Sequence, residues 1–515
     1  MKQVFKPLGI AAAVAAASAG YVNVANAQPA VANNALGDLA LVPYYTVNGE
    51  WITGIHIVNT SDRTQVVKFR FRRALDSLDA LDFNVVMSPQ DVYAGFLSDD
   101  ENGNIAWSAD DTTCTVPATT NGKLAMPAIY RGTPGEDNDA ATGYVEIIAM
   151  GSPMTETMPI AVAAKHTIDT LTPVDCAAVR SNFFANGVAG TTRGVIDNMT
   201  THQPDTDDVD GGDNVYEDAD NVLKVSYFIR DNATGIEFGD NAVHITDFIE
   251  VPTITNQQFG YLSGDLNGFD FPDLDGPEPL NTAADRGRFT LLRSADVLGV
   301  ANLINEWTAN PANGAALDWV VTMPGQYVMF DVVQYLASLA DPENEECNTS
   351  SLPDVSGDDL CDYRDIPVSA YITPYNREEL TSIPEEGELV VSPAPPGQVQ
   401  TLQLKKETNV ITFGGNSVLG QSDVDITADL GQPYGWLSLR VDSQTAGDQA
   451  VCNWNLPEAA AGSESLAAGL ALTQSCLSTS GNVPMIGFAA WARSVAANPD
   501  ASYGRIVAHS FSSSL

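Results

Sequence analysis

Alternation of apolar and polar residues gives the clearest elements of this chain. Within residues 65–72, Val67, Phe69 and Phe71 alternate with three cations. This period of two predicts a half-buried strand whose cations lie on its wet face. Residues 51–58 precede it across a polar turn at 59–62, so we expect the two runs to form an antiparallel pair.

Similar runs, separated by turn residues, predict further strands at 144–150, 160–164, 222–230, 319–323, 327–332, 399–404, 409–413, 436–441, 485–492 and 505–510. Helical spacing of apolar residues predicts a helix near 294–307, with Ser294 as its N-cap. An Ala-rich run at 458–472 is a second helix candidate. Many short strands with Gly and Pro between them predict a mainly β fold, built of antiparallel β-sandwich domains with a few short helices.

Composition shifts divide the chain into six segments. Clustered prolines indicate a linker, and a run of like charges indicates a loop. We expect a signal peptide at 1–27, an N-terminal β-sandwich domain at 28–202, an acidic loop at 203–221, a β-rich middle region at 222–391, a Pro-rich linker at 392–397 and a C-terminal β-rich domain at 398–515. An alternative is that strands of the last segment complete the N-terminal sandwich.

The first 27 residues have the three parts of a secretory signal peptide. Lys2 and Lys6 precede an apolar run at 8–20, and Ala25-Asn26-Ala27 fits a small-x-small cleavage site. We therefore expect an extracellular or cell-surface protein, with the periplasm as an alternative. Neither this run nor any later one reaches the ~18 apolar residues of a membrane-spanning helix, so we expect no transmembrane span in the mature chain.

The cysteines agree with export. Their number is even, and the chain contains no Cys-x-x-Cys pair of the kind found in zinc ribbons and thioredoxin-type sites. Pairing the nearest neighbours in sequence predicts three disulfides, although fifteen pairings are open: Cys114 with Cys176, Cys347 with Cys361, and Cys452 with Cys476.

The net charge excludes one large class of partner. The 515 residues include 24 Lys and Arg against 66 Asp and Glu, a net charge of −42. No domain-sized basic surface is available to displace counterions from phosphates, so we expect no nucleic-acid partner. With 44% hydrophobic and only 17% charged residues, the chain has enough apolar material to fold.

The acids are clustered, which suggests bound cations. Residues 294–363 hold twelve acids and no Lys or Arg, so ion pairs within that stretch are impossible. Ca²⁺ takes carboxylate, amide and carbonyl oxygens in flexible geometry and would offset this repulsion. We predict Ca²⁺ ligands in two Asp-rich loops, with a solvated turn as the alternative for each: Asp265, Asn267, Asp270, Asp273 and Asp275, and Asp354, Asp358, Asp359 and Asp362.

One local basic patch stands out in this acidic chain: Lys68, Arg70, Arg72 and Arg73. One interpretation is that it pairs with nearby acids at 76, 79 and 82. The other is an interaction patch that docks on the acidic face of a neighbouring copy.

Motifs for catalysis do not occur. The five histidines are scattered, and there is no Gly-x-Ser-x-Gly elbow, phosphate-binding loop or dinucleotide fingerprint. We therefore predict that the protein is not an enzyme. A hydrolase whose site is assembled across the fold is the less favoured alternative.

Nine short segments carry a resemblance to known proteins: 41–45, 53–61, 81–84, 88–91, 111–117, 143–151, 486–490, 503–507 and 509–510. They resemble a group of exported bacterial proteins that are described only as cell-surface proteins. The resemblance implies export and a surface location, without any catalytic residue. The acidic, Lys-poor composition is also similar to that of S-layer proteins, which assemble through Ca²⁺.

Two functions follow as expectations. The first is a secreted, surface-associated structural protein that is stabilised by disulfides and Ca²⁺. An extension of this hypothesis is that it self-assembles into a surface layer. The second is an adhesin or extracellular module that binds a glycan, a cell-envelope component or another ligand through loops on a rigid scaffold.

Overall fold

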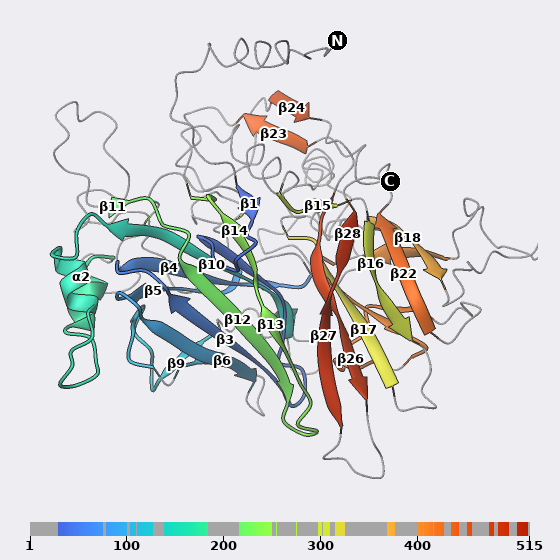
Figure 1. Cartoon of the computed structure of the whole chain (residues 1–515), viewed down its shortest axis with the longest axis horizontal. Coiled ribbons are helices and arrows are strands. Elements are labelled where there is room, and N and C mark those ends of the chain that lie inside the picture. The colour runs from blue at the N-terminus through green and yellow to red at the C-terminus, as the bar shows by residue number, and fades with distance from the viewer. Residues whose placement is uncertain are drawn as a thin grey trace, which may run out of the picture.

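The computed structural model consists of antiparallel β-sheets arranged as two packed sandwiches, with two short α-helices in the described part (Figure 1). It describes residues 29–75, 79–99, 104–109, 111–126, 139–183, 216–249, 254, 274, 297–300, 302–308, 315–324, 368–375, 400–404, 406–415, 417–426, 434–441, 451–455, 473–477, 483–493 and 502–512. The predicted mainly β class, with antiparallel sandwiches and few helices, is confirmed.

The first sandwich consists of sheet 1 and sheet 2. Sheet 1 has the order β1-β14-β2-β10-β4-β5-β8, with β11 paired to β10, and sheet 2 has the order β13-β12-β3-β6-β7-β9. The strands of sheet 1 are β1 (Ala30–Val31), β2 (Leu39–Thr46), β4 (Gln65–Arg73), β5 (Asp79–Met87), β8 (Cys114–Val116), β10 (Thr142–Pro153), β11 (Tyr216–Glu217) and β14 (Val243–Thr246). Those of sheet 2 are β3 (Trp51–Asn59), β6 (Val92–Asp99), β7 (Ile105–Ser108), β9 (Lys123–Ala125), β12 (Leu223–Asp231) and β13 (Glu237–Asn241).

Aromatic rings fill the core between sheets 1 and 2. Phe69 stacks on Phe83 with ring centroids 4.8 Å apart, and Trp107 of sheet 2 lies 5.8 and 6.2 Å from them. The indole nitrogen of Trp107 donates a 2.8 Å hydrogen bond to the Tyr93 hydroxyl, so this buried polar group is satisfied. The alternating residues predicted to face the core on 65–72 therefore do so.

The predicted pairing of 51–58 with 65–72 is wrong. β3 pairs with β12 and β6 in sheet 2, whereas β4 pairs with β10 and β5 in sheet 1. The turn between them carries the chain from one sheet to the other. A polar turn between two alternating runs is compatible with either path, and only the long-range partners decide between them.

The expected wet face of 65–72 is also wrong, because every residue of β4 is buried. Helices α2 (Pro159–Ala164) and α3 (Cys176–Ser181) cover part of the second face of sheet 1, where Ile160 and Val179 cluster with Val66 and Met150. β10 is likewise buried along its whole length. Sheet 1 thus has a covered face on both sides.

The second sandwich consists of sheet 3, in the order β21-β20-β17-β26-β27, and sheet 4, in the order β19-β18-β22-β16-β28. Among the described residues, only β20 and β21 pair in parallel. Sheet 3 contains β17 (Ala315–Thr322), β20 (Thr408–Phe413), β21 (Val424–Ile426), β26 (Ile486–Arg493) and β27 (Tyr503–Ala508). Sheet 4 contains β16 (Asn302–Thr308), β18 (Val368–Tyr375), β19 (Gln400–Leu404), β22 (Tyr434–Val441) and β28 (Ser510–Ser512).

Sheet 3 belongs to both cores. Trp319 and Val321 of β17 face the core of the second sandwich, whereas Val320 between them joins the core of the first. Phe488 of β26 also packs in the core of the first sandwich, and its ring lies 6.3 Å from that of Tyr227 in β12. The two sandwiches therefore share a continuous apolar contact through the outer face of sheet 3. Figure 1 shows β13 of the first sandwich beside β27 of the second.

A buried acid holds one loop in this contact. Asp318 accepts hydrogen bonds through Oδ2 from the Ser417 hydroxyl at 3.0 Å and from the amides of Val418 and Leu419 at 2.7 and 2.8 Å. Leu419 packs in the core of the first sandwich. Burial raises the pKa of Asp318 to about 7, because desolvation of the carboxylate outweighs these three bonds.

Two predicted elements have the other secondary structure. The strand predicted at 160–164 is helix α2, which begins at Pro159, a residue suited to the first helical turn. Of the helix predicted at 294–307, residues 297 and 298 are helical, whereas the rest of the described part forms β15 (Gly299–Val300) and β16. Burial on β16 alternates, with Leu303, Asn305 and Trp307 inside, so its true period is two.

The other predicted strands are confirmed, with shifted ends, wherever the structure describes them. The strand expected at 327–332 and the helix expected at 458–472 lie outside the described residues. Minor elements complete the fold: η2 (Asp139–Ala141), β15 paired with β25 (Val483–Pro484), and β23 (Val451–Asn455) paired with β24 (Thr473–Leu477).

Domain boundaries follow the sheets more than the sequence composition. Strands β11 to β14, at 216–246, complete sheets 1 and 2, so the first sandwich continues beyond the acidic segment 203–221. The described strands of 398–515 pair with β15 to β18 or with each other and add no strand to sheets 1 and 2, although Leu419 and Phe488 pack in the first core. Residues 1–27 and the linker 392–397 lie outside the described part.

Candidate functional site

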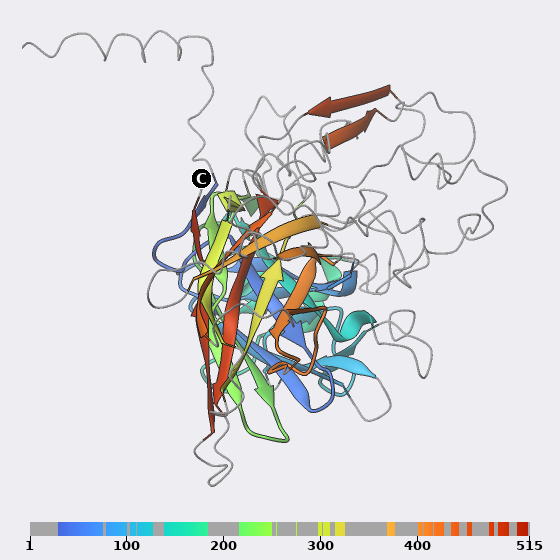
Figure 2. The same ribbon diagram turned by 90° about the vertical axis from the view of Figure 1, so that its right-hand side faces the viewer.

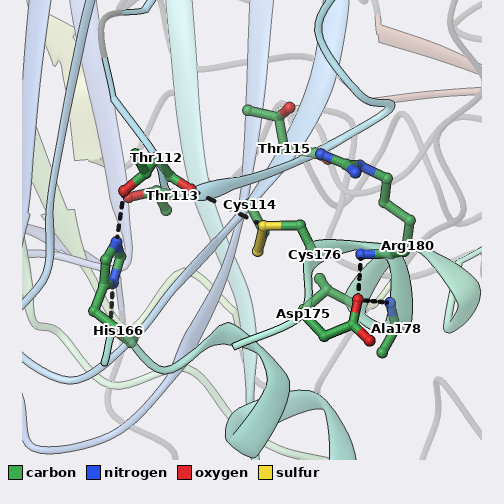
Figure 3. The surroundings of a disulfide bond; sticks show 12 residues. Thr112, Thr113, Cys114, Thr115, His166, Asp175, Cys176, Ala178 and Arg180 are labelled. Atoms are coloured by element: carbon green, nitrogen blue, oxygen red, sulfur yellow. Dashed lines mark hydrogen bonds between the residues drawn. A yellow bond between two sulfur atoms is a disulfide. The ribbon is translucent and has the colours of Figure 1, made fainter. Parts of the chain in front are cut away.

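The best-defined polar site lies where α3 is joined to β8 of sheet 1 by a disulfide (Figure 3). The predicted pair Cys114 and Cys176 is confirmed, with an S–S distance of 1.98 Å and a Cα–Cα distance of 5.2 Å. Cys114 lies on β8, and Cys176 is the first residue of α3. The bond therefore joins a strand to a helix that is 62 residues distant in sequence.

The other two predicted disulfides stay predictions. Cys452 and Cys476 lie directly opposite each other in the β23–β24 register, and such antiparallel neighbours have the Cα separation that a disulfide needs. Cys347 and Cys361 lie outside the described residues.

Asp175 and Arg180 fix the helix that carries Cys176. Asp175 is the N-cap of α3, and its Oδ1 accepts from the amides of Ala177 and Ala178 at 2.9 and 3.0 Å. Such a cap stabilises a helix end by about 1 kcal/mol. Near the other end, Arg180 Nε donates to the carbonyl of Thr115 at 2.8 Å. The helix is therefore attached to β8 by one covalent and one polar contact.

His166 bridges two parts of the same site. Its Nδ1 lies 3.2 Å from Ser88 Oγ and 3.7 Å from Asp91 Oδ2, and its Nε2 lies 3.2 Å from Thr112 Oγ1. Ser88 and Asp91 form the turn between β5 and β6, and Thr112 precedes β8. The imidazole, which lies between α2 and α3 in sequence, thus contacts the turn on one side and a hydroxyl on the other. Figure 3 shows its contact with Thr112.

Burial raises the pKa of Asp91, since desolvation of its carboxylate is the largest effect. The nearby His166 ring and the backbone amides of Ser88 and Val92 oppose this shift. The carboxylate also lies 3.3 Å from the Thr113 hydroxyl, which places one more donor around it. Asp91 is therefore a hydrogen-bonded hub for three chain segments.

The order Thr112, His166 and Asp91 has the outline of a nucleophile, base and acid triad, but its hydrogen bonds run differently. Thr112 Oγ1 donates to the carbonyl of Leu171 at 3.2 Å, and Ser88 Oγ donates to Asp91 Oδ2 at 3.5 Å. A general base must instead accept the nucleophile's proton. The imidazole cross-links the turn at 88–91 to the segment before β8.

The loop between α2 and α3 has an apolar tip. Ile168 and Leu171 are 94% and 75% exposed, and Leu171 has a positive φ of 56°. Hydroxyls of Thr167, Thr170 and Thr172 contact one another beneath them. The loop therefore keeps a defined shape through its own polar contacts and through His166.

The predicted basic patch is buried, which contradicts its interpretation as a docking surface. Lys68 Nζ and Arg70 Nε lie 3.9 and 3.5 Å from Asp82, and Arg72 makes two bonds to Glu146, at 3.0 and 3.2 Å. The fourth member, Arg73, is buried as well. The expected pairing with Asp82 is thus confirmed for two of the cations. Residues on a covered sheet face need such partners, because an unpaired buried charge is costly.

The predicted Ca²⁺ ligands all lie outside the described residues: Asp265, Asn267, Asp270, Asp273, Asp275, Asp354, Asp358, Asp359 and Asp362. Within the part that the structure describes, no three His, Cys, Asp or Glu side chains are grouped so that they could hold a metal. Two acids at the end of the acidic segment 203–221 are paired with an arginine side chain. Arg63 pairs with Glu217 and lies 3.7 Å from Asp220.

Sequence reasoning missed the His166 site. Ser88, Asp91 and Thr112 precede His166 by 54 to 78 residues, so no local spacing connects them. The one available signal was the predicted Cys114 to Cys176 bond, which encloses His166 in its loop.

Comparison with family models, characterised proteins and solved structures gives no match. No helix among the described residues is long and apolar enough to cross a membrane.

Proposed function

We propose that this chain is a secreted, surface-associated structural protein. The observation that carries the proposal is the Cys114–Cys176 disulfide, because such bonds persist in oxidising compartments outside the cytoplasm. The signal-peptide pattern of residues 1–27 supports the same location, at the cell surface or in the periplasm. The proposed role is non-catalytic, since the sequence contains none of the catalytic motifs described above.

Calcium is part of the proposal. Removing residues 1–27 deletes two lysines and no acid, so the folded chain has an even larger excess of carboxylates. Cations bound in the Asp-rich loops at 265–275 and 354–362 would stabilise the folded state by mass action and could bridge neighbouring copies into a layer.

Fractionation tests the location. We expect the full chain, expressed with residues 1–27, to be recovered outside the cytoplasm with Gln28 as its N-terminus. N-terminal sequencing measures the cleavage, and a variant with Ala25→Glu and Ala27→Glu, which removes the small residues of the cleavage site, should remain uncleaved. Recovery of uncleaved wild-type chain in the cytoplasm would contradict the proposal.

Melting curves test the calcium. We expect CaCl₂ to raise the melting temperature of the purified chain and EDTA to lower it. The variant Asp265→Asn with Asp270→Asn should lose part of that difference, whereas Asp240→Asn, at an exposed position of β13, should keep it. Curves that coincide in CaCl₂ and EDTA would remove the ion from the proposal, and electron microscopy of the calcium form tests for ordered arrays.

A further inference from the structure

The outward face of sheet 4 carries four aromatic side chains. Buried residues alternate along β18 and β22, so the residues between them point away from the core of the second sandwich. This face lies on the side of the second sandwich remote from the first, and Figure 2 views the molecule from that side. We name it the aromatic face: Tyr371 and Tyr375 of β18, and Tyr434 and Trp436 of β22.

The rings of the aromatic face are ordered against one another. Tyr375 lies opposite Trp436 in the register, and their rings stack with centroids 3.8 Å apart and an interplanar angle of 7°. Trp436 and Tyr434 are nevertheless 39% and 40% exposed. Stacking holds the indole in a fixed orientation, so its free surface is presented without further ordering.

Hydrogen-bonding groups lie between these rings. Outward residues of β22 follow one another about 7 Å apart, in the order Tyr434, Trp436, Ser438 and Arg440. Arg440 lies 5.8 Å from the Tyr371 ring centroid. An entirely apolar partner would bury the hydroxyl and the guanidinium without replacing their bonds to water. The ligand must therefore offer apolar and polar groups in alternation.

The charge of the protein narrows the class of possible ligands further. Glu306 lies opposite Trp436 on the neighbouring strand β16, and it pairs with Arg505. Arg440 is the one cation on the outward side of β22, in a chain of net charge −42. A polyanion would be repelled by such a chain. A neutral ligand meets no such barrier.

We propose that the aromatic face binds a neutral carbohydrate chain. The C–H groups on the face of a pyranose ring are slightly positive and pack on the electronegative faces of Trp436 and Tyr434. Sugar hydroxyls then bond to Arg440 and Ser438, which replaces the water lost on binding. This binding goes beyond the proposed structural role and needs neither calcium nor assembly.

Affinity electrophoresis of the full mature chain in native gels tests this site. The probes are hydroxyethyl cellulose, glucomannan and amylopectin, each run with and without EDTA. We expect at least one to retard the wild type in both conditions, and Trp436→Ala to weaken that retention at least ten-fold. Trp436→Phe should keep part of it, because a ring remains.

Tyr503→Ala is the matched control, since Tyr503 is an exposed aromatic residue of β27 that packs on Trp491, outside the aromatic face. It should leave retention unchanged. Retention by none of the probes, or equal loss in Trp436→Ala and Tyr503→Ala at unchanged melting temperature, would overturn the proposal. So would a change of oligomeric state in Trp436→Ala, which would show that the face packs against another copy. If the melting temperature proves to be independent of calcium, the calcium part of the proposed function fails, whereas retention by the carbohydrate is still expected.

Discussion

Asp318 couples folding to pH at the contact between the two sandwiches. Burial raises its pKa from 3.8 to about 7, so between these values the folded chain retains a proton that the unfolded chain releases. The stability contributed by this group is present at low pH and is lost as the pH rises toward 7. Asp38, next to β2, behaves in the same way, since burial raises its pKa to about 7 as well.

Asp318→Asn should remove the share of this pH dependence that belongs to Asp318. The amide oxygen can still accept from the loop at 417–419 but cannot ionise. Relative to wild type, the free energy of unfolding of the variant should therefore rise between pH 4 and 8 by up to about 4 kcal/mol, at 1.36 kcal/mol per pKa unit.

Urea denaturation at a series of pH values measures this difference. Asp240→Asn, at an exposed position, controls for the loss of one negative charge. Parallel pH profiles for wild type and Asp318→Asn would show that the buried carboxyl does not titrate with folding.

At the scale of elements, α3 depends on its disulfide. It has six residues, too few to be stable alone. Replacing both cysteines, Cys114→Ala with Cys176→Ala, should lower the free energy of unfolding by about 4 kcal/mol, the loop-closure value for a separation of 62 residues.

The same variant should be cut by trypsin after Lys165 and Arg180 faster than wild type, because α3 and the loop before it lose their attachment to β8. Limited proteolysis with mass spectrometry measures the cleavage rates. Val162→Ala, at an exposed position of α2, is the control. Equal rates in all three proteins would mean that His166 and Asp175 hold the segment without the covalent bond.

At the scale of the whole molecule, the two sandwiches should unfold as one unit, because sheet 3 contributes to both cores. Phe488→Ala removes a buried ring from their contact and should cost about 3–5 kcal/mol. We expect a single calorimetric transition in wild type that moves as a whole to lower temperature in the variant.

Phe511→Ala, which truncates an exposed ring on β28, should leave this transition in place. Two separate transitions in wild type, of which Phe488→Ala moves only one, would show that the sandwiches unfold independently.

The local sequence pattern alone was sufficient to predict the mainly β class and to predict which side chains share one face of a strand. Val67, Phe69 and Phe71 face the core as predicted, because the period of a strand depends only on the backbone. The Cys114–Cys176 pair also followed from sequence, although by the simple rule of nearest neighbours. The strand at 222–230 was predicted, whereas those at 237–241 and 243–246 were not, and nothing local placed any of them in the first sandwich.

The tertiary structure decided what each face meets. Lys68, Arg70 and Arg72 were predicted to face solvent, yet sheet 1 is covered on both sides, and the partner of Arg72, Glu146, comes from the distant strand β10. Residues 302–308 also fit a helical period, because apolar side chains occupy both odd and even positions. Pairing with β22 makes them a strand.

The stack of Tyr375 on Trp436 likewise exists only through the register of β18 and β22. Sequence determines the period of an element, because period is a property of the local backbone. Packing determines which side is buried and which side chains meet, because both depend on contacts between residues far apart in the chain.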